Sequence, residues 1–238
     1  MKTLKCILAV LLVTCVSIYA DGQVKKPVAK KPVAVIKKTA GTRVKITTDM
    51  GVIVIRLYDS TPLHRDNFIK LVQTHFFDSL LFHRVINGFM IQGGDPLSKN
   101  AKPGEMLGMG GGDMPRIPAE FRPNLIHKKG VLAAARDGNP EKASSACQFY
   151  LVQGRIMNDA ELNQVECSVR QTNPEFYYTD EQRKIYKTLG GTPNLDMNYT
   201  VFGEVESGIN VIDKIAATPT APGDRPLTDV RMKMEIIK

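Results

Sequence analysis

The segment of residues 81–95 limits the possible folds of this chain more than any other, because it places two apolar runs around a turn signal. It reads LFHRVINGFMIQGGD, with Asn87-Gly88 between apolar runs at 81–86 and 89–92. Asn-Gly is the commonest dipeptide of two-residue hairpin turns because both residues accept a positive φ. The segment therefore predicts a β-hairpin.

Further short segments with strand character follow one another along the chain. The last of them alternates Val230, Met232, Met234 and Ile236 with polar residues, which is typical of a strand with one buried face. Turn residues separate most of them, as expected for antiparallel strands. The predicted strands outside the hairpin are residues 43–47, 52–57, 130–137, 148–152, 199–205 and 230–237.

Two segments carry helix signals instead. Residues 60–75 begin with Ser60 or Thr61 as N-cap and Pro62 at the first helical position. Residues 208–216, GINVIDKIA, predict a second, shorter helix. Closure removes strand edges that would otherwise be exposed. We therefore expect a mainly β fold, a closed or nearly closed antiparallel barrel capped by two α-helices.

A polar, helix-favouring stretch at 154–194 interrupts this series of strands. Thr179 is suited to cap a helix, Gln182 follows three residues later, and Gly190 is suited to end it. We interpret the stretch as an insertion with at least one helix, packed on the rim of the barrel.

The first 20 residues predict a secretory signal peptide. Lys2 and Lys5 precede an apolar run at 7–16, and Ala20 is a small residue at the expected cut. The run is shorter than the roughly 20 apolar residues that span a bilayer. We expect export to a periplasm, with a eukaryotic secretory route as the alternative compartment. An uncleaved anchor is one alternative; lipid attachment at Cys15 is another, against which Thr14 argues.

A Lys/Pro-rich tether at 21–41 precedes the folded domain, expected at 42–238. Residues 1–40 hold eight Lys and one Asp, a net charge of +7 out of +8 for the whole chain, so the remainder is close to +1. Because the domain has no basic bias, we expect no nucleic-acid binding. The tether is suited to an anionic envelope surface.

The remaining residues do not indicate a metal site, a cofactor or a nucleophile. The four His lack metal-ligand spacing, and G-x-S-x-G does not occur. Cys147 and Cys167 could pair in an oxidising compartment, or Cys147 could be a small buried residue of a strand. The distinctive residue is Arg84, a cationic side chain within a mostly apolar segment. Its guanidinium needs a hydrogen-bond acceptor there, and we expect a substrate carbonyl to be that acceptor.

Four segments resemble the signature segments of the cyclophilin-type peptidyl-prolyl cis/trans isomerases, in the same order. They are FHRVINGFMIQGGD at 82–95, GVLAAA at 130–135, SACQFYLV at 145–152 and YTVFGEV at 199–205. The resemblance extends over residues 43–238 apart from the insertion. It implies a closed eight-stranded antiparallel β-barrel capped by two α-helices, to which the helical insertion is added.

The resemblance also implies a site. Arg84 corresponds to the family's catalytic arginine, and Ala135 to the backbone that pairs with a substrate strand. His83 corresponds to a neighbouring histidine, for which a satisfied buried ring is the plain alternative, and Tyr199 stands where histidine is common. For the pocket residues the plain alternative is ordinary core. The apolar pocket for a proline ring would be Phe89, Met90, Tyr150 and Leu195, with Gln92 and Gln148 as its polar rim.

The activity implied is X-Pro isomerisation in exported proteins during their folding, without acid, base or nucleophile. The expected partners are proline-containing peptides and unfolded protein segments, bound by a monomer. A peptide-binding module of the same fold with little turnover is the alternative. Asn194 aligns with a tryptophan that many members have and that is linked to cyclosporin binding, so weak cyclosporin sensitivity is expected.

Overall fold

The computed structural model describes residues 41–238. The predicted leader, and the predicted tether up to residue 40, lie outside these residues. The described chain contains eight strands, four α-helices and two 3-10 helices. The strands are β1 (Arg43–Thr48), β2 (Gly51–Leu57), β3 (Phe82–Ile86), β4 (Met90–Gly93), β5 (Val131–Ala134), β6 (Phe149–Val152), β7 (Val201–Ser207) and β8 (Met232–Ile237).

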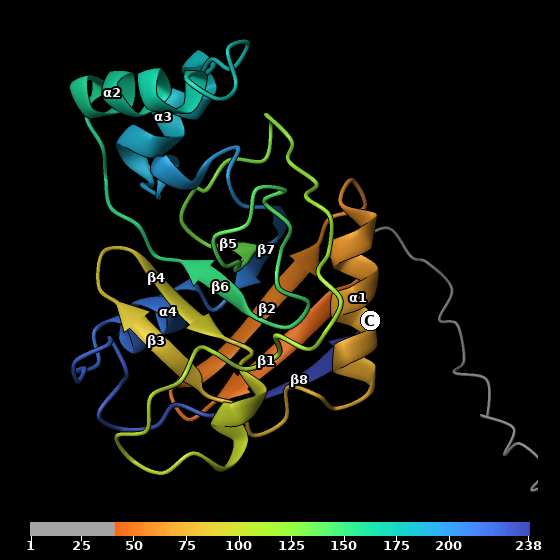
Figure 1. The fold of residues 1–238 in the computed structure, drawn as a ribbon. Coiled ribbons are helices and arrows are strands. Elements are labelled where there is room, and N and C mark those ends of the chain that lie inside the picture. The colour runs from red at the N-terminus through yellow and green to blue at the C-terminus, as the bar shows by residue number, and fades with distance from the viewer. Residues whose placement is uncertain (1–40) are drawn as a thin grey trace, which may run out of the picture. The chain divides into compact units, whose positions relative to one another are not determined.

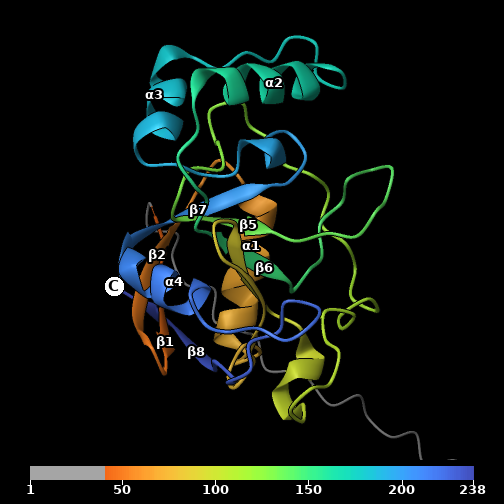
Figure 2. The same cartoon turned by 90° about the vertical axis from the view of Figure 1, so that its left-hand side faces the viewer.

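The helices lie in two groups (Figures 1 and 2). The helices α1 (Pro62–Gln73) and α4 (Ile209–Ala216) pack against the sheet, whereas α2 (Asp159–Arg170) and α3 (Asp180–Thr188) lie together at one end of the fold. Helices α2 and α3 occupy the predicted insertion. Within this insertion, capping residues were recognised from the sequence for α3 only. Within residues 41–238, none of the helices has the length and apolar character needed to cross a bilayer.

The eight strands form one sheet in the order β3-β4-β6-β5-β7-β2-β1-β8. Neighbouring strands pair antiparallel throughout. The expected eight antiparallel strands are present, but the expectation of a closed barrel is wrong: the sheet is a curled half-barrel. Its end strands β3 and β8 are connected through one isolated bridge, Leu81 with Arg231, rather than a ladder. Beyond that bridge the Val85 N–H donates to the Asp224 carbonyl at 2.8 Å. The loop before β8 thus occupies the edge of β3 that a closing strand would need.

The main core lies between the sheet and helices α1 and α4. Phe68 of α1 contacts the rings of Phe77, Phe149 and Phe202, with centroid separations of 5.0–5.6 Å. The start of α1 is held by Glu120, whose carboxylate accepts the N–H groups of residues 63 and 64 at 3.2 and 3.0 Å. The predicted N-cap Thr61 occupies that position but makes no side-chain capping bond.

Strand β6 connects this core to a second apolar cluster because its side chains alternate. Phe149 and Leu151 point into the main core, and Tyr150 and Val152 belong to the second cluster. Tyr150 is in register with Gln92 of β4 and Ala133 of β5. This alternation brings Tyr150 to the face of the sheet where the cavity described next is found.

Candidate active site

A cavity of about 530 Å³ opens on this face of the half-barrel. Segments far apart in the sequence form it: the β3–β4 hairpin, strand β6, the glycine-rich loop 104–109, and the loop 221–225. Nine of the ten residues expected at the site line it. They are His83, Arg84, Phe89, Met90, Gln92, Ala135, Tyr150, Leu195 and Tyr199.

Gln148, the tenth, lines an adjoining hollow of about 310 Å³ that shares Gln92 and Ala135 with the cavity. Gln148 accepts from Gln92 Nε2 at 2.9 Å, and its own Nε2 donates to the carbonyls of Gly108 and Gly110, both at 2.9 Å. Gln148 therefore attaches the glycine-rich loop to the strands.

Arg84 lies on the cavity rim, with 44% of its side chain exposed. Its Nε donates to Asp224 Oδ2 at 3.1 Å, so the acceptor in this structure is a carboxylate of the protein. An ion pair exposed to this degree contributes only about 0–1 kcal/mol to stability. The terminal Nη1 and Nη2 make no hydrogen bond within the described residues. Asp224 thus orients the guanidinium while leaving its outer N–H groups for a ligand.

The floor of the cavity is apolar and well packed. Met90 and Tyr150 are buried, and Leu195 and Phe89 are partly buried in the same cluster. The ring of Tyr199 meets that of Tyr150 edge-on at 6.0 Å. Such a surface is suited to an apolar ring of the size of proline.

His83 is buried beside the cavity, and neither ring nitrogen has a hydrogen-bond partner among the described residues. Burial, with a smaller contribution from the charge of Arg84, lowers its pKa to about 4. The ring is therefore neutral near pH 7 and adds no charge beside the guanidinium.

The backbone of Ala135, which was expected to pair with a substrate strand, has partners within the protein. Its N–H donates to the Gln148 carbonyl at 3.0 Å, and its carbonyl accepts from Ser145 N–H at 2.8 Å. The next residue, Arg136, makes no backbone hydrogen bond within residues 41–238. At this edge the backbone N–H and carbonyl of Arg136 are therefore free within the described residues.

The sequence reasoning missed several residues of the cavity wall. Arg136 places its guanidinium carbon 4.6 Å from the centre of the Tyr199 ring, a cation–π contact. Met106 and Met109 lie at the mouth, 96% and 86% exposed. Their only sequence signal was a methionine-rich glycine loop next to the hairpin.

The remaining candidate chemistry gives no second centre. Among residues 41–238, no group of three or more His, Cys, Asp or Glu side chains is arranged to hold a metal ion. Cys147 and Cys167 do not pair: Cys147 is buried and Cys167 is exposed. Burial raises the pKa of the Cys147 thiol, as expected for the small buried residue.

Solved structures show the same fold. A crystal structure of a cyclophilin-type peptidyl-prolyl cis-trans isomerase from Cryptosporidium parvum superposes with a TM-score of 0.61 at 21% identity, over 83% of this chain and 98% of that one. The same protein in the presence of the dipeptide Ala-Pro gives a TM-score of 0.58 at 21% identity, over 82% and 99%. The half-barrel with its lateral cavity is therefore a cyclophilin fold.

The sequence identifies the family. The family model described as "Cyclophilin type peptidyl-prolyl cis-trans isomerase/CLD" matches residues 43–236. A Staphylococcus saprophyticus protein whose name assigns it to the peptidyl-prolyl cis-trans isomerases is 31% identical over 83% of this chain and 94% of its own length. A Staphylococcus aureus protein of the same name is 32% identical over 79% and 87%. The chain belongs to the cyclophilin-type peptidyl-prolyl cis-trans isomerases.

Proposed function

We propose that the 530 Å³ cavity binds an X-Pro segment and that Arg84 catalyses its isomerisation. The observation that carries the proposal is the position of the Arg84 guanidinium, held by Asp224 at the edge of an apolar floor. Phe89, Met90, Tyr150 and Leu195 would receive the proline ring. The outer N–H groups of Arg84 would face the amide.

The chemistry needs only differential binding. Conjugation of nitrogen with the carbonyl gives the peptide bond a rotation barrier of about 18–20 kcal/mol, and X-Pro bonds isomerise in tens to hundreds of seconds. An enzyme accelerates the rotation by binding the twisted amide more tightly than the planar forms. A preorganised guanidinium stabilises the twisted state by donating to the amide, whose nitrogen lone pair has left conjugation.

The substrate chain would cross the cavity along the free edge at Arg136. An extended peptide that pairs with the Arg136 backbone next to the apolar floor is held by main-chain hydrogen bonds, and the pocket selects the proline. The Ala-Pro dipeptide named with the Cryptosporidium parvum cyclophilin supports a proline-containing ligand. The natural ligands would be proline-containing peptides and unfolded protein segments.

The same proposal places the protein outside the cytoplasm, as a monomer that assists the folding of exported proteins in a periplasm. Its support is the leader at 1–20, in sequence alone. The Lys/Pro-rich tether at 21–41 would hold the domain near an anionic envelope surface. The proposed isomerase activity and the proposed attachment through the tether require no cofactor, metal or nucleic acid.

The experiment that tests the proposal is a proline-limited refolding assay. We expect Arg84→Ala to reduce the acceleration by about 100-fold, the loss typical of removing a donor that stabilises developing charge. Arg84→Lys should recover little of it because an ammonium lacks the planar fork. Arg122→Ala, an exposed arginine outside the cavity, is the control. Full activity in Arg84→Ala would refute the assignment.

One observation favours a second role beside isomerisation, the holding of unfolded chains in a step that needs no turnover. Met106 and Met109 present two almost fully exposed flexible apolar side chains at the cavity mouth, a surface suited to varied partners. The double variant Met106→Ser, Met109→Ser removes this apolar surface. It should bind a reduced, unfolded protein more weakly and should still isomerise a short X-Pro peptide. Leu227→Ser, also exposed and outside the cavity, is the control. Unchanged binding in the double variant would exclude this role.

A further inference from the structure

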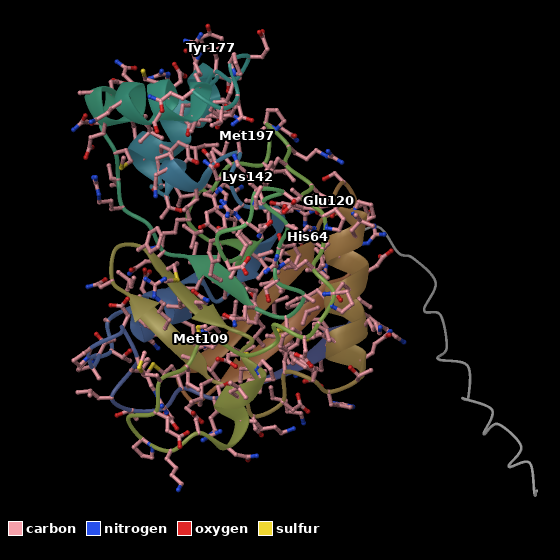
Figure 3. All side chains as sticks on the ribbon, in the orientation of Figure 1. His64, Met109, Glu120, Lys142, Tyr177 and Met197 are labelled. Atoms are coloured by element: carbon pink, nitrogen blue, oxygen red, sulfur yellow. The ribbon has the colours of Figure 1, made fainter. Side chains whose placement is uncertain are left out.

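A buried carboxylate, Asp196, lies between the helical insertion and the cavity. It is 2% exposed and accepts four hydrogen bonds. Its Oδ1 accepts from the backbone N–H and ring Nδ1 of His127 at 2.8 and 2.7 Å. Its Oδ2 accepts from the hydroxyls of Tyr178 and Tyr186 at 2.7 and 2.6 Å. Met197, the next residue, lies between the half-barrel and the insertion (Figure 3).

The His127 ring connects this carboxylate to the cavity. Because Nδ1 faces a carboxylate it carries the proton there, and the other ring nitrogen, Nε2, faces Tyr150. Nε2 lies 3.0 Å from the hydroxyl of Tyr150, within hydrogen-bond distance. The two rings are stacked at 6.1 Å with an interplanar angle of 15°. Tyr150, whose ring lines the cavity, is thus held at its far end.

The two tyrosines on the other side belong to the insertion. Tyr186 is on α3 and Tyr178 precedes that helix, and their rings meet edge-on at 5.6 Å in the insertion's own apolar cluster. Burial, followed by the charge of Asp196, raises the pKa of both hydroxyls well above the ordinary value. Both therefore remain protonated and donate. The shorter contact of Tyr178 is the one to Asp196; its hydroxyl also lies 3.2 Å from the Pro193 carbonyl.

We propose that the insertion at 154–194 positions Tyr150 in the substrate cavity through Asp196 and His127, and so sets how tightly the proline ring is held. The inference rests on the proposed function of the cavity. Asp196 cannot turn without leaving buried donors unpaired, which makes its orientation depend on the insertion. His127, Asp196, Tyr178 and Tyr186 are positioning residues, since none of them lines the cavity.

The coupling is tested with substitutions that remove hydroxyls and keep rings. Kinetic constants for a short X-Pro peptide are measured for the wild type, for Tyr178→Phe with Tyr186→Phe, for Tyr150→Phe, and for the triple variant. We expect the insertion pair to raise KM about three- to tenfold, with kcat within about twofold, as for one or two lost buried hydrogen bonds. In the Tyr150→Phe background the same pair should change KM less than about twofold.

Tyr177→Phe is the matched control. Tyr177 is the neighbouring tyrosine of the insertion, 57% exposed and at its outer side, and its ring contacts Arg170 instead of Asp196 (Figure 3). It should leave both constants unchanged. Equal increases in KM with and without the Tyr150 hydroxyl would overturn the coupling, because a general loss of packing acts in both backgrounds.

A spectroscopic readout keeps the test decisive if the double variant folds poorly. The His127 Nδ1–H proton resonance, observed by NMR in the single variant Tyr178→Phe, should shift, whereas Tyr177→Phe should leave it in place. An unmoved resonance in Tyr178→Phe would also overturn the coupling. A wild-type protein without isomerase activity would instead refute the proposed function, which separates the two failures.

Discussion

The Nε of Arg84 donates to Asp224 Oδ2 at 3.1 Å, across 140 positions of the sequence. The backbone of the same aspartate accepts the N–H of Val85. Asp224 therefore makes two contacts: its carbonyl accepts at the edge of β3, and its carboxylate orients the guanidinium at the cavity. One residue thus contacts both the edge of β3 and the proposed catalytic group.

Removing the Asp224 carboxylate should reduce activity without unfolding the protein. Asp224 has a φ of +63°, a conformation that asparagine tolerates, so Asp224→Asn keeps the backbone. We expect kcat/KM to fall about three- to tenfold because the guanidinium is less well oriented, with at most about 1 kcal/mol lost in unfolding free energy. Peptide isomerase assays and urea unfolding measure the two effects. Asp159→Asn, an exposed carboxylate of the insertion, is the control; unaltered kcat/KM in Asp224→Asn would contradict the orienting role.

A side chain at Gly110 should displace the glycine-rich loop. A Cβ built there would lie 2.0 Å from Asp95 Oδ1, and Asp95 is buried and accepts the N–H of Gly108 in the cavity wall. We expect Gly110→Ala to destabilise the protein by roughly 1–3 kcal/mol, the usual range for overpacking, and to weaken binding of an X-Pro peptide.

Gly112, two residues further along the chain, supplies the control for this experiment. A Cβ at Gly112 meets nothing within 4 Å, so Gly112→Ala should be neutral in both thermal unfolding and peptide titration. If the two alanine variants behave alike, the close contact with Asp95 does not determine the loop position.

Acid should destabilise the protein through His83. The pKa of His83 is about 4 in the folded protein, against an ordinary value of 6.5. Between these two pH values the unfolded chain binds a proton at His83 and the folded protein does not. The stability from the neutral ring is fully present above pH 6.5, decreases as the pH falls towards 4, and is lost below it. The loss corresponds to roughly 3 kcal/mol of unfolding free energy.

His83→Phe removes this titration and keeps a buried ring at the position. No hydrogen bond is lost, because the ring nitrogens of His83 have no partners within the described residues. Urea unfolding at several pH values between 4 and 7 should therefore show a shallower dependence on pH than in the wild type. His75→Asn, at an exposed histidine with a φ of +56°, should retain the wild-type slope. A wild-type slope in His83→Phe would mean that other groups govern the acid sensitivity.

Local sequence was sufficient for several of the elements and for nine of the residues that line the cavity. The Asn87-Gly88 turn and the Pro62 helix start are encoded within a few residues, and the hairpin and α1 form where they were expected. The long segment around Arg84 identified the family, and with it nine residues that the fold brings to one cavity.

Contacts between distant segments were not predictable in this way. Nothing near Arg84 or Val85 in the sequence indicates that Asp224 binds both, so the open edge and the orienting carboxylate were missed. The occupied backbone of Ala135 and the path from Tyr186 to Asp196 likewise depend on strand register and on the packing of the insertion.

The sequence by itself determined the strands, the principal helices, the cyclophilin family and most of the expected cavity residues, because these follow from local conformational preference and from motifs contained in four short segments. The tertiary structure alone decided that the barrel stays open, which group holds Arg84, and how the insertion reaches Tyr150. Those outcomes are hydrogen bonds between groups far apart along the chain, and their geometry exists only after the segments have packed.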